Sequence, residues 1–294
     1  MRTRRMLVAG VISATAVLAV VAANLPADAS EHRRRHHQQG GSAPAGWNLT
    51  WSDEFAGSSG TSPDDTKWVF DTGGEPQWGN QEWQYYTDRP ENVSLDGAGN
   101  LAITARKEQL PGMGGCPYGT CDITSGRITT KGRFAQAYCR LEASIKVPEG
   151  QGMWPAFWMM GTNIDEVSWP ACGEIDIMET VGKTPKKVEG TAHATGFPDV
   201  GIGGDITVSA PLADAFHTFA VEWTPTSITW FVDTTAYFTL SKSQLDSGQQ
   251  WPFDQPFYLL LNLAVGGEMP GPPDASTPFP STMLVDYVRA YTKA

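Results

Sequence analysis

Short segments with strand character recur along almost the whole chain, and no segment of any length has helical periodicity. They are rich in Val, Ile, Thr, Phe, Tyr and Trp and are separated by clusters of Gly, Pro, Asn and Asp. At most, Lys242–Ser247 could form one helical turn. With 31 Gly and 21 Pro in the chain, this pattern predicts an all-β, two-sheet antiparallel sandwich and argues against a (β/α)8 barrel or a doubly wound fold. The expected strands are Leu101–Arg106, Gly132–Val147, Trp154–Met160, Glu174–Thr180, Phe216–Thr224, Ser227–Val232, Phe257–Val265 and Leu284–Tyr291.

Residues 1–29 have the features of a secretory signal peptide. Arg2, Arg4 and Arg5 form a basic start, Met6–Ala23 is apolar, and Ala27–Ala29 supplies a small-x-small cleavage pattern. The apolar stretch is just long enough to act instead as a membrane anchor, but the cleavage pattern favours removal. No later segment is apolar for long enough to span a bilayer. We therefore expect a secreted, extracellular protein with no membrane attachment after cleavage.

Residues 30–46 form a basic and polar leader, and residues 47–294 form the folded part of the chain. The leader has too little apolar content to offset the entropy of ordering, so we expect it to be flexible. Its adjacent histidines could bind a metal, but the three arginines beside them make a poor ligand cage. From residue 47 onward there is no linker-like break and no fixed-period repeat, which favours a single β-sandwich domain.

The net charge excludes one class of partner. The formal charge is −11, and removing residues 1–29 takes away three Arg and one Asp and leaves −13 (−11 − 3 + 1). An acidic protein repels phosphate backbones, so we expect no nucleic-acid partner, whereas neutral sugars are not repelled. We expect a monomer.

Four cysteines in an exported chain are candidates for two disulfides. Cys116 and Cys121 enclose a turn-rich spacer that can close a small loop, so we expect that bridge. Cys139 and Cys172 then pair by elimination and could join neighbouring strands, although two buried thiols are the alternative. No cysteine spacing resembles a zinc site.

The acidic segment Glu174–Glu179 contains an irregularity in its alternation. Glu174 and Asp176 share one face of a strand, and the isoleucines share the other. Continued alternation would turn Glu179 into the core, where an unpaired carboxylate is costly. One extra residue, a β-bulge around Ile177–Met178, returns Glu179 to the acidic face. We therefore predict a bulge at this position.

Three carboxylates on one strand face predict acid–base chemistry. The alternative is a solvated edge strand protected by its acids, but no Lys or Arg interrupts the run and large aromatics lie just upstream. Closely spaced acids cannot all ionise, so one keeps its proton near neutrality. Glycosidic bond cleavage needs one ionised and one protonated carboxyl group, and Glu174 and Glu179 suit these roles, with Asp176 tuning both. A straight strand would separate the two glutamate Cα atoms by roughly 16 Å, so their side chains must lean together.

Aromatic and amide side chains near the acids predict sugar contacts. Period two places Trp154 and Trp158 on one face with a small residue between them, and sugar rings stack on such indoles; core packing is the alternative. Trp78 and Asn80 lie in a Gly-rich loop with the mixture of aromatic and amide groups that a sugar site uses, although Asn80 could merely shape an Asx-turn. His193 lies one strand beyond the acids and could line the acceptor side.

Two further polar residues lie in apolar surroundings. His217 stands among phenylalanines and is expected to satisfy a core hydrogen bond. Asn262 interrupts an unalternating apolar run, typical of a strand buried on both faces. It is either a residue of the sugar site or a hydrogen-bonded core amide.

These residues together resemble glycoside hydrolase family 16, in particular its bacterial endo-β-1,3-glucanase (laminarinase) branch. Gly173–Glu179 matches the family signature E-[I/L/V]-D-[I/V]-x-E in its bulged form. Supporting matches are Trp51–Phe55, Gly79–Glu82, Gly152–Trp158 and Asn262–Gly267. The resemblance extends from about residue 47 to residue 291, so it covers the whole expected domain.

The resemblance implies a β-jelly-roll sandwich with a substrate cleft across its concave sheet and a retaining double displacement on β-glucan. By position, Glu174 is implied as the nucleophile, Glu179 as the acid/base and Asp176 as the residue that orients the nucleophile. No cofactor is implied for catalysis. Many members carry a structural calcium ion, and the matching positions here are Glu54, Gly97 and Asp286.

The resemblance leaves the substrate and the activity partly open. The extra Met178 argues for the laminarinase branch, because lichenases, which cut mixed-linkage β-1,3-1,4-glucan, usually have the shorter motif. Agarases and carrageenases are further alternatives. Some relatives are non-catalytic glucan-binding proteins, but those typically lack one or both glutamates. Transglycosylation would use the same residues as hydrolysis.

Overall fold

The computed structural model of the protein describes residues 43–294. The predicted signal peptide at 1–29 and most of the leader at 30–46 lie outside the described residues. The described residues fall within one compact unit, Gly40–Ala294. None of their helices is both long and apolar enough to cross a membrane.

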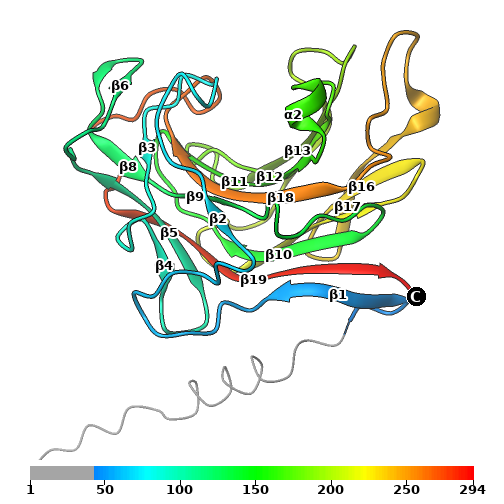
Figure 1. Cartoon of the computed structure of the whole chain (residues 1–294), viewed down its shortest axis with the longest axis horizontal. Coiled ribbons are helices and arrows are strands. Elements are labelled where there is room, and N and C mark those ends of the chain that lie inside the picture. Colours follow the sequence, from blue (N-terminus) through cyan, green and yellow to red (C-terminus); the bar gives the residue numbers. More distant parts are fainter. Residues whose placement is uncertain (1–42) are drawn as a thin grey trace, which may run out of the picture. The chain divides into compact units, whose positions relative to one another are not determined.

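Two large sheets stack to form the predicted all-β sandwich, and the prediction of its fold class is confirmed (Figure 1). The first is a ten-stranded sheet in which β1 (Trp47–Asp53) pairs with β19 and β4 (Val93–Leu95) pairs with β5. Its other strands, in spatial order, are β17 (Thr235–Ser241), β16 (Ser227–Val232), β15 (His217–Trp223), β10 (Arg140–Lys146), β19 (Ser281–Lys293), β5 (Leu101–Lys107), β8 (Ile123–Ser125) and β3 (Tyr85–Tyr86).

The second, seven-stranded sheet carries the acidic strand in the middle of the layer. The face of this sheet that is turned away from the ten-stranded sheet is called the outer face below, and loops rise on both sides of it (Figure 1). The strands are, in spatial order, β14 (Ile202–Thr207), β13 (Lys187–His193), β12 (Glu174–Glu179), β11 (Met153–Gly161), β18 (Phe257–Val265), β9 (Arg127–Thr129) and β2 (Val69–Phe70).

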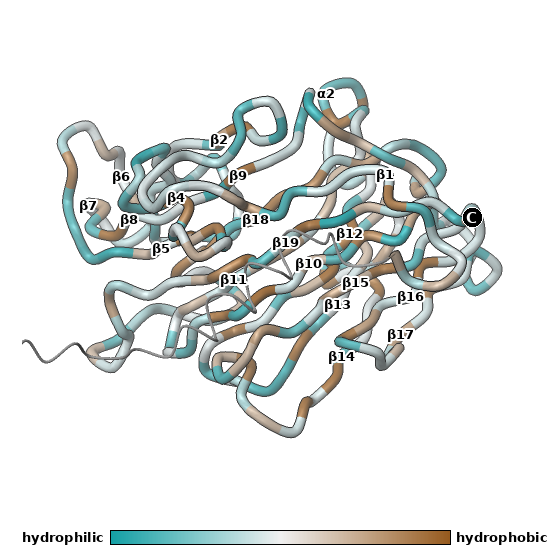
Figure 2. Tube along the Cα trace, turned by 90° about the horizontal axis from the view of Figure 1, so that it is seen from below, coloured by the Kyte–Doolittle hydropathy of each residue, from teal (hydrophilic) through white to brown (hydrophobic). Residues whose placement is uncertain are grey.

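The core lies between the sheets because alternate residues of their strands face inward. In β5 the buried residues alternate strictly with half-buried ones, and Figure 2 shows hydrophobic and hydrophilic residues alternating along the strands. The strand β18 differs, since all of its residues are buried. This confirms the expectation that the apolar run around Asn262 is covered on both faces.

Most expected strands are present, but Gly132–Val147 is wrong as a single strand. Only β10 forms, and residues 132–139 precede it as a turn and a loop. The backbone has positive φ at Gly132 (73°) and at Tyr138 (52°), a conformation that breaks a strand. Short helical elements occur at α2 (Ile164–Val167), which was not expected, and at η1 (Lys242–Gln244), within the expected turn.

The cysteines divide into one bridge and two thiols. Cys116 and Cys121 form the predicted disulfide beside the two-stranded hairpin of β6 (Gly115–Cys116) and β7 (Gly119–Thr120). The predicted bridge between Cys139 and Cys172 is wrong, because both are free and buried. Cys139 precedes β10 in the ten-stranded sheet, whereas Cys172 precedes β12 in the other sheet and contacts Met160. The two residues therefore lie in different layers.

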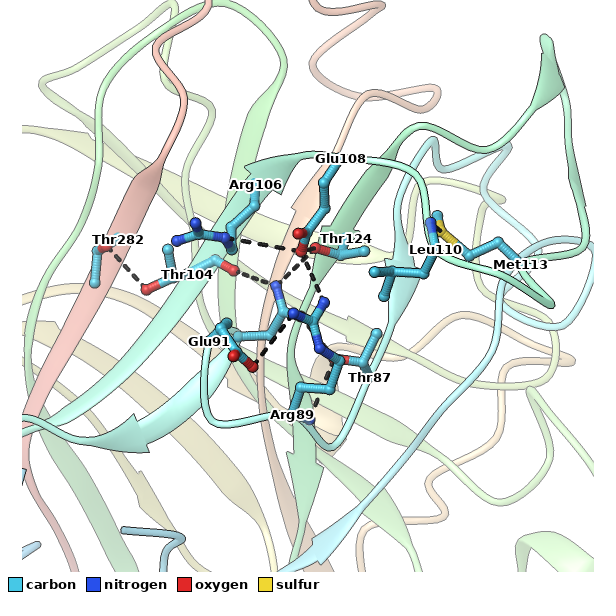
Figure 3. Close-up of polar contacts among 11 residues, drawn as sticks. Thr87, Arg89, Glu91, Thr104, Arg106, Glu108, Leu110, Met113, Thr124 and Thr282 are labelled. Atoms are coloured by element: carbon cyan, nitrogen blue, oxygen red, sulfur yellow. Dashed lines mark hydrogen bonds and ion pairs between the residues drawn. The ribbon is translucent and has the colours of Figure 1, made fainter. Parts of the chain in front are cut away.

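A polar cluster around Glu108 fixes the chain that follows β3 (Figure 3). Arg89 Nη1 lies 2.9 Å from Glu108 Oε1, and Thr124 Oγ1 donates to the same oxygen at 2.7 Å. Arg89 also pairs with Glu91 at 3.3 Å. These contacts join the segment after β3 to β5 and β8. The strand β3, which precedes Arg89, borders the site described next.

Candidate active site

The strand β12 contains the predicted β-bulge. Its neighbour β11 pairs Phe157 with Met178 but Trp158 with Asp176, so Ile177 has no partner on β11. The ladder with β13 shifts between Asp176 and Glu179 as well. Ile177 and Met178 are both fully buried. Two consecutive side chains therefore enter the core, and Glu179 returns to the outer face.

Three carboxyl groups consequently share the outer face of β12, and each has a specific neighbour. Trp169 Nε1 donates to Glu174 Oε2 at 2.6 Å, and Trp154 Nε1 donates to Glu179 Oε1 at 2.9 Å. Asp176 lies between the glutamates and is 3% exposed. Its Oδ2 is 3.2 Å from His193 Nε2, without the alignment of a hydrogen bond.

Burial shifts the protonation of all three acids in the same direction. Burial, with the nearby charge of Asp176, raises the pKa of Glu174 to about 8. Burial, with the charge of Glu174, raises the pKa of Glu179 to about 7. Burial and the charge of Glu179 raise the pKa of Asp176 well above its usual range. The cluster therefore holds protons near neutrality and ionises in part. The pKa of Glu174 is the higher of the two glutamates, so the roles of anion and acid follow from position and not from the order of the pKa values.

The tryptophans of β11 share the face of the acids, as the alternation predicted. The ladder pairs Ala156 with Glu179 and Trp158 with Asp176, and Trp154 lies one alternation further. Both tryptophans remain partly exposed, whereas Phe157 and Met159 between and after them are fully buried. The small side chain of Ala156 leaves the two indoles separated, so a ring with an apolar C–H face can lie beside them.

A second aromatic group forms around Arg127, the first residue of β9. The Arg127 guanidinium lies 4.4 Å from the Trp78 ring centroid and 4.9 Å from that of Trp158. Asp71 Oδ2 accepts from Arg127 Nε at 2.9 Å, which fixes the guanidinium between the rings. The loop of Trp78 and the strand of Trp158 are thus joined into one surface through a cation.

The hydrogen bonds of Asn262 decide between the two roles that the sequence left open for it. It lies opposite Ala156 on the outer side of β18 and is 6% exposed, and both ends of its amide are hydrogen-bonded. Its Oδ1 accepts from Trp158 Nε1 at 2.7 Å, and its Nδ2 donates to Tyr86 Oη at 3.1 Å. Asn262 is therefore a hydrogen-bonded amide behind the site, and it orients Trp158.

Comparison with known proteins identifies the family. Residues 79–289 match the model of glycosyl hydrolases family 16. The chain belongs to glycoside hydrolase family 16. A β-glucanase of Rhodothermus marinus is 43% identical over 83% of this chain and 85% of its own length. The solved endo-β-1,3-glucanase of Pyrococcus furiosus is 44% identical, covers 84% of this chain and 95% of its own, and has a TM-score of 0.78.

A second similar structure comes from a complex with a sugar. It is a variant of a non-specific endo-β-1,3(4)-glucanase that was co-crystallised with 1,3-β-D-cellotriosyl-glucose. It is 40% identical, covers 85% of this chain and 96% of its own, and has a TM-score of 0.76. The family membership confirms the recognition made from the acidic strand, and with it a glycoside hydrolase on a jelly-roll sandwich.

Two residues of the site, Trp169 and Arg127, were not expected from the sequence, and neither was the burial of a third, Glu82. Trp169 lies on the loop between α2 and β12 and is 52% exposed; only its position five residues before Glu174 could have drawn attention to it. Arg127 follows a glycine in a short strand and carries no local motif. Glu82 was recognised within Gly79–Glu82, but nothing in the sequence indicated that it is buried.

Asn80 and His193 lie where the sequence analysis placed them, at the border of the site. Asn80 is exposed and its Nδ2 donates to Glu82 Oε1 at 3.1 Å. His193 pairs with Glu174 across the ladder of β12 and β13. His217 does form a hydrogen bond, but its partner is Asp233 at 2.9 Å on the surface rather than a group in the core.

One of the predicted calcium positions has a side chain that is already paired. Both carboxylate oxygens of Glu54 accept from Arg289, at 2.8 and 2.6 Å, so this side chain is engaged by a cation and does not fit as a calcium ligand. Within residues 43–294, no three or more His, Cys, Asp or Glu side chains are grouped to hold a metal. A structural calcium ion at the positions Glu54, Gly97 and Asp286 stays a prediction.

Proposed function

We propose that the protein is a secreted, retaining endo-β-1,3-glucanase that hydrolyses laminarin-type β-glucan. The observation that carries the proposal is the outer face of β12, where Glu174, Asp176 and Glu179 lie together beside the tryptophans of β11. Export after residue 29 and a monomeric state belong to the same proposal. The names of the relatives support the β-1,3 linkage, since the Pyrococcus furiosus protein is an endo-β-1,3-glucanase.

The proposed reaction is a double displacement. The Glu174 carboxylate attacks the anomeric carbon and forms a glycosyl ester, while Glu179 gives its proton to the departing oxygen. Glu179 then takes a proton from water, the water oxygen attacks the same carbon, and the ester bond to Glu174 breaks. Asp176, beside Glu174 and with a raised pKa, can donate a hydrogen bond to the nucleophile.

The geometry of β12 supports this reaction. Glu174 lies opposite Met160 and Glu179 opposite Ala156, so the bulge reduces the separation of the glutamates to four ladder positions. Their Cα atoms are therefore about 13 Å apart rather than the 16 Å of a straight strand. The two side chains can lean toward each other over Asp176, and a retaining pair needs carboxyl groups about 5–5.5 Å apart.

Two variants test the chemistry. Glu174→Ala and Glu179→Ala should each abolish the release of reducing ends from laminarin while the thermal unfolding curve stays cooperative, because both steps need both groups. NMR of the first product should show the β anomer. Near-normal turnover in either variant would refute the assignment, and an initial α anomer would contradict retention.

A mixed-linkage activity is the second candidate, because one similar structure is a non-specific endo-β-1,3(4)-glucanase. Product sizing on laminarin, curdlan, lichenan, agarose and carrageenan separates the candidates. We expect rapid cleavage of laminarin, and equal rates on lichenan would favour the mixed-linkage enzyme. Binding of laminarin without new reducing ends would instead indicate a glucan-binding protein. N-terminal sequencing of the exported protein tests cleavage after Ala29.

A further inference from the structure

Glu82 is a buried carboxylate at the border of the site, and every side chain that reaches it donates a hydrogen. It is 4% exposed. Asn80 Nδ2 donates to its Oε1 at 3.1 Å. Gln84 Nε2 and Tyr86 Oη donate to its Oε2, at 2.5 and 3.2 Å. A carboxylate that receives three donors is suited to the ionised state, although burial raises its pKa.

The orientation of two of these donors is fixed by their other hydrogen bonds. The Gln84 amide is fixed because its Oε1 accepts from the backbone N–H of Val265 at 2.7 Å, which leaves only its NH2 group for Glu82. The Tyr86 oxygen already accepts from Asn262 Nδ2, and Asn262 in turn accepts from Trp158 Nε1. The hydrogen of Tyr86 is therefore directed to Glu82. Only the Asn80 amide has a free choice of orientation.

The backbone around Asn80 is also fixed. The N–H groups of Asn80 and Glu82 both donate to Glu75 Oε1 at 3.1 Å, and the Asn80 carbonyl accepts from the N–H of Glu268 at 3.0 Å. A methyl group built on Gly267 would lie 2.9 Å from that carbonyl and 3.4 Å from the Trp154 ring. The backbone of Asn80 therefore lies near the indole of Trp154, which donates a hydrogen bond to Glu179. From there the exposed Asn80 side chain can reach a sugar held beside the proposed acid/base.

We propose that Glu82 is a positioning residue that sets the hydrogen-bonding character of Asn80. By accepting from the side-chain NH2 group of Asn80, the buried anion leaves the side-chain oxygen, Asn80 Oδ1, for the substrate, and this oxygen accepts a hydrogen from a hydroxyl of the glucan. The inference rests on the proposed function, because it assigns Asn80 to the binding of that substrate. Glu82 itself does not touch the sugar.

The isosteric variant Glu82→Gln tests the proposal. The new side chain has one oxygen and one NH2 group, and Gln84 and Tyr86 both require the oxygen. The new NH2 group must then face Asn80, whose amide has to turn over and present its own NH2 group to the sugar. The substrate hydroxyl loses its acceptor, which a net hydrogen-bond contribution of about 1 kcal/mol converts to about a fivefold fall in kcat/KM on laminarin oligosaccharides. We expect most of the loss in KM, since the contact is with a bound sugar rather than the reacting bond.

A second substitution should restore what the first removes. In the double variant Glu82→Gln with Asn80→Asp, the new NH2 group donates to one oxygen of the new carboxylate, and the other oxygen faces the substrate as an acceptor. We expect kcat/KM to return to within about twofold of the parent protein. Asn80→Asp alone places two carboxylates together and should be impaired. A merely structural role of Glu82 would not give such a rescue.

The controls separate this proposal from the proposed function. Glu91→Gln, at an exposed ion pair with Arg89, should leave the kinetics unchanged, and all variants are compared by thermal unfolding. If the parent protein does not cleave laminarin, the proposed function fails. If it does, an unchanged kcat/KM in Glu82→Gln, or a double variant no better than Glu82→Gln alone, would overturn the positioning role. If Glu82→Gln unfolds, the double variant is measured instead. Recovery of both Tm and kcat/KM supports the positioning role, and recovery of Tm without kcat/KM contradicts it.

Discussion

Replacing Glu179 by Gln should make the protein more stable at alkaline pH, although it removes the proposed acid/base. Gln keeps the shape of the side chain and an oxygen for the 2.9 Å hydrogen bond from Trp154. What it removes is a carboxyl group whose ionisation is opposed by burial and by the charge of Glu174. The folded protein therefore binds a proton at Glu179 more tightly than the unfolded chain does, and this difference makes the free energy of unfolding depend on pH.

The size and sign follow from the two pKa values. Glu179 titrates at about 7 when folded, against an ordinary value of 4.5. Because the folded pKa is the higher one, the contribution of Glu179 to the free energy of unfolding is fully present below pH 4.5. It is lost as the pH rises from there through the folded pKa of about 7. Integrated from about pH 5 to pH 9, the shift corresponds to a loss of about 2–3 kcal/mol. Gln does not titrate, so the variant avoids this loss.

Urea unfolding at pH 5 and pH 9 measures the effect. The difference in free energy of unfolding, variant minus wild type, should increase by about 2–3 kcal/mol between the two pH values. Titratable groups that both proteins share cancel in this difference, except where they contact the cluster. Glu91→Gln, on the surface, should show no such increase. A difference that is equal at both pH values would refute the claim that Glu179 is partly buried in a like-charged cluster.

Three further predictions concern residues around the site and the cysteines. Trp169→Phe removes the 2.6 Å hydrogen bond that lowers the pKa of Glu174, so kcat/KM on laminarin should fall about tenfold, with the acidic limb of its pH profile moved upward and Tm little changed. Cys139 and Cys172 are free and buried, and burial raises the pKa of their thiols to about 12 and about 11. A thiol reagent should therefore detect neither thiol in the native protein and both after unfolding. If it detects none after unfolding, the two cysteines are bridged. Cys116→Ser with Cys121→Ser opens a bridge with a sequence separation of 5, which should lower the free energy of unfolding by about 2 kcal/mol in urea melts.

The outer face of β12 could be derived from sequence because side-chain direction in a strand depends only on local order. Alternation placed Glu174 and Asp176 together, and the cost of burying Glu179 required a bulge, which the ladders with β11 and β13 contain. The same local reasoning placed Trp154 and Trp158 on that face. These predictions needed no knowledge of which strands are neighbours beyond the acidic strand itself.

Features that depend on distant segments were beyond such reasoning. Pairing Cys139 with Cys172 by elimination assumed neighbouring strands, but the two residues belong to different sheets. The burial of Glu82 arises because Gln84 meets Val265 and Tyr86 meets Asn262 on β18, contacts between residues about 180 positions apart. Only the assembled sandwich shows that this glutamate is enclosed by donors.

The geometry of the bulge weakens the link between the extra Met178 and substrate preference. Glu174 lies opposite Met160 and Glu179 lies opposite Ala156, two residues of β11 that are four positions apart. Two acids would have the same spacing in a regular strand without the extra residue between them. The insertion therefore keeps the acids at the spacing of the shorter motif and adds one buried side chain and a local change of twist. The number of residues between the glutamates cannot by itself select the sugar linkage. The selection must come from side chains that line the outer face, above all Trp154, Trp158 and the loop of Asn80, and these are the positions at which a change of linkage preference should be sought.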